Sequence, residues 1–134
     1  MVFQVTRNGD VEVRGITLTS DENAKANFSN VNKRQILEKL VSIPIKEWNY
    51  KTDPTNVQHI GPTSQDFQGA FGLNGDDDVH ISIVDAQGVA LAAIQGLNEK
   101  LNVENAQLRV ALNSLAARLA ALESKFGNHA ATGV

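Results

Sequence analysis

The sequence contains no cysteine, and aromatic side chains make up only 5% of its 134 residues. The absence of cysteine excludes a disulfide scaffold and thiolate metal sites. The shortage of aromatic residues removes the side chains that contribute most area to a hydrophobic core. A chain of this length is one domain's worth. We therefore expect part of its burial to come from association between chains.

Clustered basic residues and long apolar runs are also missing. The 12 lysine and arginine residues are scattered and the net charge is −3, so the sequence does not predict a nucleic-acid-binding surface. No apolar run approaches the roughly 18 residues of a membrane span, and the N-terminus lacks the apolar core of a signal peptide. We therefore expect no nucleic-acid partner and no membrane partner.

The sequence also lacks the spacing that metal and nucleotide sites require. His59, His80 and His129 show no ligand spacing, and Asp76–Asp78 lack the alternation and distal glutamate of a calcium loop. The glycines of residues 69–75 are not accompanied by the lysine of a phosphate-binding loop. We expect no metal and no cofactor.

Apolar and polar residues alternate over residues 2–18, with Asn8-Gly9 between two arms. This dipeptide suits the positive φ angles of a tight turn, so the pattern predicts a β-hairpin. The apolar positions of the two arms are Phe3, Val5, Val11 and Val13. Two short strands are marginal alone. The hairpin is therefore either part of the same domain or the end of a β-rich stalk that enters from upstream.

The middle of the chain alternates between short helical and strand-like patterns. The spacing of apolar residues predicts a helix over 31–41, which Asn30 or Asn32 could cap. Residues 45–50 are typical of a strand, residues 51–58 of a polar loop, and a short helix follows from Ser64 or Gln65 to Phe71. A second strand is predicted over 80–84. We expect the aromatic rings of Trp48 and Tyr50 to be buried.

From residue 85 onward the pattern changes to a heptad repeat. Apolar residues recur every seven positions, at Ile94, Leu101, Leu108, Leu115 and Leu122. The positions four residues after these are Asn98, Asn105, Leu112, Leu119 and Phe126. This alternation predicts a coiled coil. The alternative is a long helix packed on its own domain, but a helix of about 40 residues would be about 60 Å long, more than a small domain can cover.

A hydroxyl and an amine lie five residues apart in the segment Ser20-Asp21-Glu22-Asn23-Ala24-Lys25. They are the minimum parts of a Ser/Lys nucleophilic pair, in which a neutral lysine takes the proton of the serine. Asp21 could act at the turn or orient the amide that is cut. The alternative is that Ser20 and Asp21 only cap a helix that begins near Glu22, with Lys25 in solvent.

Three stretches of the sequence resemble one family over residues 20–97. They are Ser20-Asp21-x-x-x-Lys25-x-Asn27; Trp48-Asn49-Tyr50-Lys51 followed by residues 59–67; and Val84-Asp85-x-x-Gly88 continuing to Leu97. The sequence is similar to the self-cleaving intramolecular chaperone domain of the endosialidase type, found at the C-terminus of phage tail spikes and tail fibres. A related domain occurs in membrane-bound myelin regulatory factors.

The resemblance implies an α+β fold with three functional parts. Residues 1–19 would be the end of an upstream β-stalk and residues 20–84 a small α/β chaperone core. Residues 85–127 would form a trimeric coiled coil, and residues 128–134 a flexible tail. The trimer seam would consist of Ile94, Leu101, Leu108, Leu112, Leu115, Leu119 and Leu122. The number of chains follows from the resemblance alone, because asparagines at core positions of the heptad, such as Asn98 and Asn105, are also found in dimers.

The resemblance also implies a function and places its residues. Such domains trimerise, template the folding of an upstream β-helical stalk, and then sever themselves in a single turnover. The nucleophile falls on Ser20 and the catalytic lysine on Lys25, so the cut bond is Thr19–Ser20 or Ser20–Asp21. Asn27 and His59 are candidates for supporting roles. The partners would be two further copies of the chain and its own stalk.

Two other functions remain open from the sequence. The module could trimerise without cleavage and stay on the fibre, or it could be a fibre tip that binds a cell-surface glycan. On the self-cleaving interpretation, the domain acts in the host cytoplasm during virion assembly and is absent from the mature tail.

Overall fold

The computed structural model describes residues 3–5, 7, 11–13 and 20–133. The chain divides into two compact units, residues 1–30 and 31–134. The predicted turn at Asn8-Gly9 and the apolar residues Ile16 and Leu18 lie outside the described residues.

The first unit contains the predicted hairpin. Strand β1 (Phe3–Val5) pairs antiparallel with β2 (Val11–Val13), with Phe3 opposite Val13 and Val5 opposite Val11. The pairing confirms the predicted hairpin, whose two strands take the residues on either side of the predicted turn. A 3₁₀ helix, η1 (Glu22–Ala24), follows later in this unit.

The second unit contains three α-helices and a second two-stranded sheet. Its elements in chain order are α1 (Lys33–Ser42), β3 (Lys46–Trp48), β4 (His59–Gly61), α2 (Ser64–Phe71) and α3 (Ile83–Thr132). Strands β3 and β4 are antiparallel, with Trp48 opposite His59. The α+β fold class with a long C-terminal helix is confirmed, and the trimer stays a prediction.

Helix starts in this unit are set by side-chain caps. Asn32 accepts the backbone N–H of Gln35 at 3.1 Å, so it is the cap of α1 rather than Asn30. Thr63 accepts from the N–H of Asp66 at 3.1 Å, and α2 therefore begins at Ser64, one of the two predicted starts. Each cap satisfies one of the N–H groups that a helix start leaves without a partner.

The predicted strand over 80–84 is wrong. The Asp77 carboxylate accepts the backbone N–H groups of Val79 and His80 at 2.9 and 3.0 Å, which closes a turn at the start of the predicted strand. Ser82 then caps α3 by accepting from the N–H of Asp85 at 3.4 Å. Strand β4, three residues around Ile60, was not predicted.

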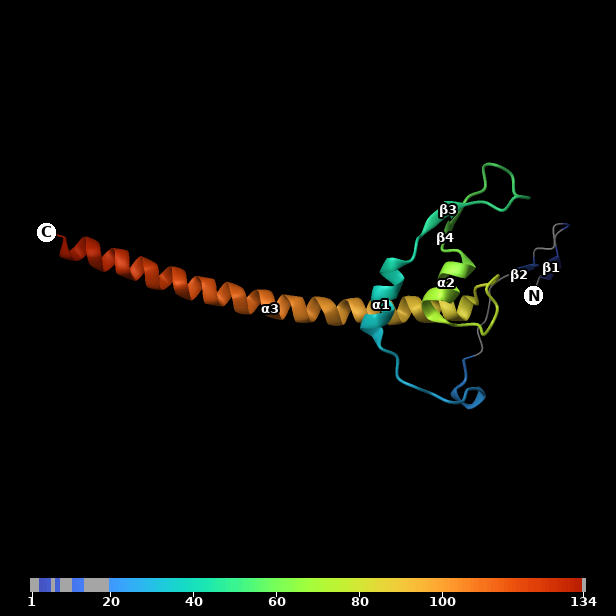
Figure 1. The fold of residues 1–134 in the computed structure, drawn as a ribbon, viewed down its shortest axis with the longest axis horizontal. Coiled ribbons are helices and arrows are strands. Elements are labelled where there is room, and N and C mark those ends of the chain that lie inside the picture. The colour runs from blue at the N-terminus through green and yellow to red at the C-terminus, as the bar shows by residue number, and fades with distance from the viewer. Residues whose placement is uncertain (1–2, 6, 8–10, 14–19, 134) are drawn as a thin grey trace. The chain divides into compact units, whose positions relative to one another are not determined.

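Helix α3 is 50 residues long, which corresponds to about 75 Å. Figure 1 shows α1 beside the N-terminal part of α3, while the rest of α3 extends beyond it. The helix continues to Thr132, so most of the segment predicted as a flexible tail is helical; its flexibility stays a prediction.

The core is small, and its buried side chains come from α2 and α3. Among the described residues, the buried apolar side chains are Phe67, Val89 and Ala93, with exposed fractions of 6%, 5% and 3%. Gly96 continues this stripe on α3, and the carbonyl of Lys33 in α1 lies directly against it. The ammonium group of Lys33 also pairs with Glu99 at 3.6 Å.

Candidate active site

Ser20 and Lys25 meet through their side chains. The Nζ of Lys25 donates a hydrogen bond to the Oγ of Ser20 at 2.6 Å, and both residues are exposed. This is the contact that the sequence hypothesis required, and the role of the two residues in cleavage stays a prediction. Chemically, a neutral amine at this distance can take the hydroxyl proton, whereas an ammonium group has no free electron pair to do so.

The capping alternative describes part of the same segment. Asp21 is the cap of η1, because its Oδ1 accepts the backbone N–H of Asn23 at 3.0 Å. The N–H of Lys25 donates to the carbonyl of Glu22 at 3.1 Å. The segment therefore makes one tight turn, and this turn brings residues 20 and 25 together. The cap and the Ser20–Lys25 contact coexist.

Two other predicted residues flank the pair in sequence. Asn27 has a φ of 57°, in the left-handed region that asparagine adopts more readily than most residues. It therefore turns the chain just after Lys25. Thr19 lies outside the described residues.

His59 belongs to the second unit, where it joins an aromatic cluster. Its ring centroid lies 4.8 Å from that of Trp48 and 5.5 Å from that of Tyr50. Its Nε2 is 3.3 Å from Oδ2 of Asp53, and the same oxygen accepts the N–H of Tyr50 at 2.9 Å. Asp53 thus ties both arms of the β3–β4 hairpin together. These contacts describe a role for His59 in the hairpin.

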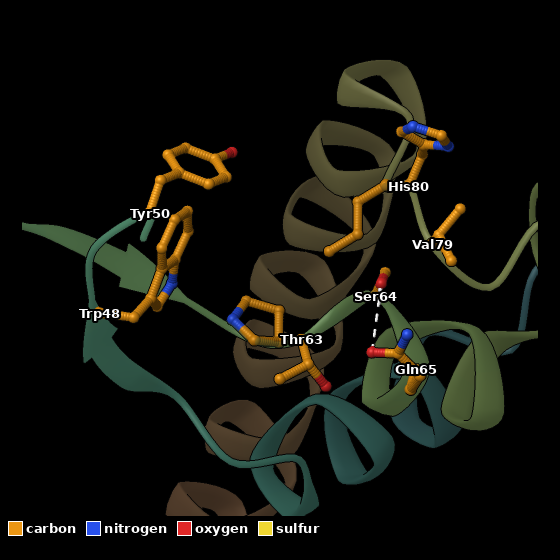
Figure 2. A pocket seen from close by; sticks show the side chains of 9 residues that line it. Trp48, Tyr50, Thr63, Ser64, Gln65, Val79 and His80 are labelled. Atoms are coloured by element: carbon orange, nitrogen blue, oxygen red, sulfur yellow. Dashed lines mark hydrogen bonds between the residues drawn. The ribbon is translucent and has the colours of Figure 1, made fainter. Parts of the chain in front are cut away.

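An open groove of about 490 Å³ lies beside this hairpin. Figure 2 shows Trp48 and Tyr50 on one side and Val79 and His80 on the other, with Thr63 and Ser64 between them. The remaining lining residues are Pro62, Gln65 and Ile81.

The expected burial of both aromatic rings is wrong for Tyr50, which is 59% exposed, and Trp48 is half-buried. The rings project from a short two-stranded sheet that no further strand covers in the described chain. Their place next to the polar loop 51–58 was the available signal for exposure.

The predicted seam residues form an exposed stripe along α3. Ile94, Leu108 and Leu122 are 64%, 62% and 53% exposed. The other members, Leu101, Leu112, Leu115 and Leu119, are exposed as well. A single-chain fold leaves this stripe in water, which is costly for apolar surface.

In the residues that the structure describes, no group of three or more His, Cys, Asp or Glu side chains could hold a metal ion. Within the same residues, no helix combines the length and the apolar character that a membrane span needs.

Residues 20–75, which include the Ser20–Lys25 contact and the β3–β4 hairpin, match the family model described as chaperone of endosialidase, peptidase S74. This part of the chain is a chaperone-of-endosialidase domain, from a family of autoproteolytic serine peptidases. The match begins at Ser20 and ends before α3. No curated protein matches the chain.

Proposed function

We propose that this chain is an intramolecular chaperone that trimerises, templates the folding of an upstream β-helical stalk, and releases itself by cutting next to Ser20. The observation that carries the proposal is the 2.6 Å contact between Lys25 and Ser20, at the first residue of the chaperone-of-endosialidase match. The proposal also includes the division of the chain into a stalk end (1–19), a chaperone core (20–84), a trimerising helix (85–127) and a tail (128–134).

The cutting step uses the two side chains in named roles. Neutral Lys25 takes the proton from Oγ of Ser20, and the oxygen attacks the carbonyl carbon of the bond to be cut. The tetrahedral intermediate collapses to an ester, while Lys25 returns its proton to the departing amine. Water then hydrolyses the ester and restores the hydroxyl. Within one chain this route cuts Thr19–Ser20, because attack on the carbonyl of Ser20 itself would close a strained four-membered lactone. Cleavage of Ser20–Asp21 would need the Ser20 hydroxyl of another copy, and the N-terminal residue of the product distinguishes the two bonds.

Trimerisation is supported by the surface that a single chain leaves exposed. Only three apolar side chains of the described residues are buried, while the leucine stripe of α3 is in water. A parallel bundle of α3 helices would bury this stripe, at about 25 cal/mol for each Å² of apolar surface removed from water. The bundle would also hold the upstream chain ends together, raising the effective concentration of strands that must pair between chains.

Assembly would also switch on the reaction. Ser20 and Lys25 are exposed in the single chain, and the reaction needs the neutral amine of lysine. A neighbouring copy that covers the pair would disfavour the charged form and supply the neutral amine. Once the stalk is assembled, release of the domain removes the template and leaves a product that unfolds slowly.

The experiment follows the mass of the chain over time. A cutting chain loses a fragment of about 19 or 20 residues, whereas Ser20→Ala and Lys25→Ala stay intact while still forming trimers by light scattering. Ser20→Ala tests the nucleophile, and a shortened product from that variant would overturn the proposal. A Lys25→Ala variant that is cut at the normal rate would show that another group is the base.

The dependence on assembly is tested at the helix seam. Leu108→Asp introduces a charge into the leucine stripe, and we expect loss of the trimer and at least tenfold slower cleavage. Val110→Asp is the matched control, because Val110 is 70% exposed and lies off the stripe. If monomers of the Leu108 variant cut as fast as the trimer, assembly does not control the reaction.

If the mass never changes under any condition that supports trimers, the domain is a trimerisation module that stays on its fibre. On the cutting proposal, it acts in the host cytoplasm during phage assembly and leaves the mature tail.

A second function is favoured by the groove in Figure 2. Exposed Tyr50 and half-buried Trp48 stand beside the hydroxyl and amide groups of Ser64 and Gln65, a combination suited to a sugar ring. A fibre tip that binds a cell-surface glycan would use this groove. Binding of the intact chain to an array of bacterial surface polysaccharides, lost in Trp48→Ala and kept in Val110→Asp, would support it.

A further inference from the structure

The turn between Ser20 and Lys25 is held by one side chain. Oδ1 of Asp21 accepts two hydrogen bonds from Asn23, one from the backbone N–H and one from the side-chain Nδ2, each at 3.0 Å. The backbone then continues the turn, because the carbonyl of Asp21 accepts the N–H of Ala24 at 3.1 Å. All of these contacts lie inside the six residues that carry the proposed dyad.

Closure of this turn is required for the Ser20–Lys25 contact. Five residues of extended chain separate Cα atoms by about 16–18 Å, more than the two side chains together can bridge. A 3₁₀ turn rises only about 2 Å for each residue, which brings the ends within reach. The population of the turn therefore sets the fraction of chains in which the amine touches the hydroxyl.

We propose that Asp21 is a positioning residue for cleavage: its carboxylate oxygen caps η1 and so holds Lys25 against Ser20. This inference rests on the proposed self-cleavage. Asp21 acts here through its acceptor oxygen and not through its charge. An N-terminal cap contributes enough to change the closed population several-fold in an exposed segment of this kind.

A short series of variants distinguishes the two possible roles of the Asp21 carboxylate, which are capping the turn and carrying a negative charge. Asparagine and serine are N-caps of similar quality to aspartate but carry no charge, whereas glutamate keeps the charge and caps poorly. If capping is the role, Asp21→Asn and Asp21→Ser cut at close to the original rate, and Asp21→Ala and Asp21→Glu cut about two- to tenfold more slowly. If charge is the role, Asp21→Glu is the active variant and the asparagine and serine variants are slow.

Controls keep the result specific to the turn. Glu22→Ala changes the same exposed helix without removing the cap and should cut normally. Asn23→Ala removes one of the two hydrogen-bond donors to Asp21, so its cleavage rate should lie between those of the original chain and Asp21→Ala. The unfolding midpoint and trimer mass of each variant, measured with Ser20→Ala added, should match the Ser20→Ala parent, because the segment is exposed.

The outcomes also separate this inference from the proposed function. Cleavage of Ser20→Ala would overturn the self-cleavage itself. If Ser20→Ala is inert but Asp21→Ala cuts at the original rate, only the positioning role is wrong. Equal slowing in the alanine, asparagine and serine variants would likewise overturn the capping role.

Discussion

Replacing Gly96 by alanine tests the packing of α1 on α3 directly. A Cβ atom at this position would overlap the carbonyl oxygen of Lys33, and would lie 2.7 Å from its carbonyl carbon and 3.3 Å from the backbone nitrogen of Arg34. These are backbone atoms at the start of α1, so no side chain can rotate away. The two helices must move apart to accept the methyl group.

The size of the effect follows from two opposing terms. Alanine is favoured over glycine by about 1 kcal/mol inside a helix. Overpacking a close contact costs about 1–3 kcal/mol. Gly88 is the matched control, because it lies in the same helix and a Cβ there meets nothing within 4 Å. The helix-propensity term cancels between the variants, so Gly96→Ala should be less stable than Gly88→Ala by about 1–3 kcal/mol.

The assay is urea unfolding at one protein concentration, because the stability of an oligomer depends on concentration. Ser20→Ala should be present in both variants so that cleavage does not change the sample. We expect Gly88→Ala to have a higher urea midpoint than the parent chain, and Gly96→Ala to have a lower midpoint than Gly88→Ala. If the two alanines are equally stabilising, α1 does not sit on Gly96 and the described core is wrong.

Two further predictions concern capped turns. Asn32→Ala removes the cap of α1 and should lower the free energy of unfolding by about 1 kcal/mol in the same assay, whereas Asn32→Ser should restore most of it. Backbone N–H bonding from Val79, followed by the His80 ring, lowers the pKa of Asp77 below its ordinary value of 3.8. The Asp77 carboxylate therefore stabilises the fold fully above pH 3.8, and this stabilisation is lost as the pH falls through the lower pKa of the folded state. The amide NMR shift of Val79 should follow this titration, and Asp77→Asn is the control that should not respond to pH.

Local patterns predicted the elements whose stabilising contacts are also local. The alternation around Phe3 and Val13 gave a hairpin, and the helix from Ser64 to Phe71 appears with the predicted bounds. The apolar period from Ile94 onward predicted a long helix. In each case the residues that decide the structure lie within a few positions of one another.

The errors come from contacts that a pattern does not display. Residues 80–84 have the composition of a strand, but the Asp77 side chain accepts the N–H group of His80 and helix α3 already begins at Ile83. Strand β4 depends on pairing with β3, so its three residues carry little signal of their own. Tyr50 is apolar enough for a core, but among the described residues no further strand joins the β3–β4 sheet beside it.

By itself, the sequence determined two features. A hydroxyl and an amine lie five residues apart, and an apolar stripe is too long for one small domain to cover. Those features are local and are fixed by spacing. Only the tertiary structure decided that the backbone of α1 lies against Gly96 and that Trp48 and Tyr50 line a groove. These depend on which atoms meet in space, and the spacing of residues along a chain does not specify that.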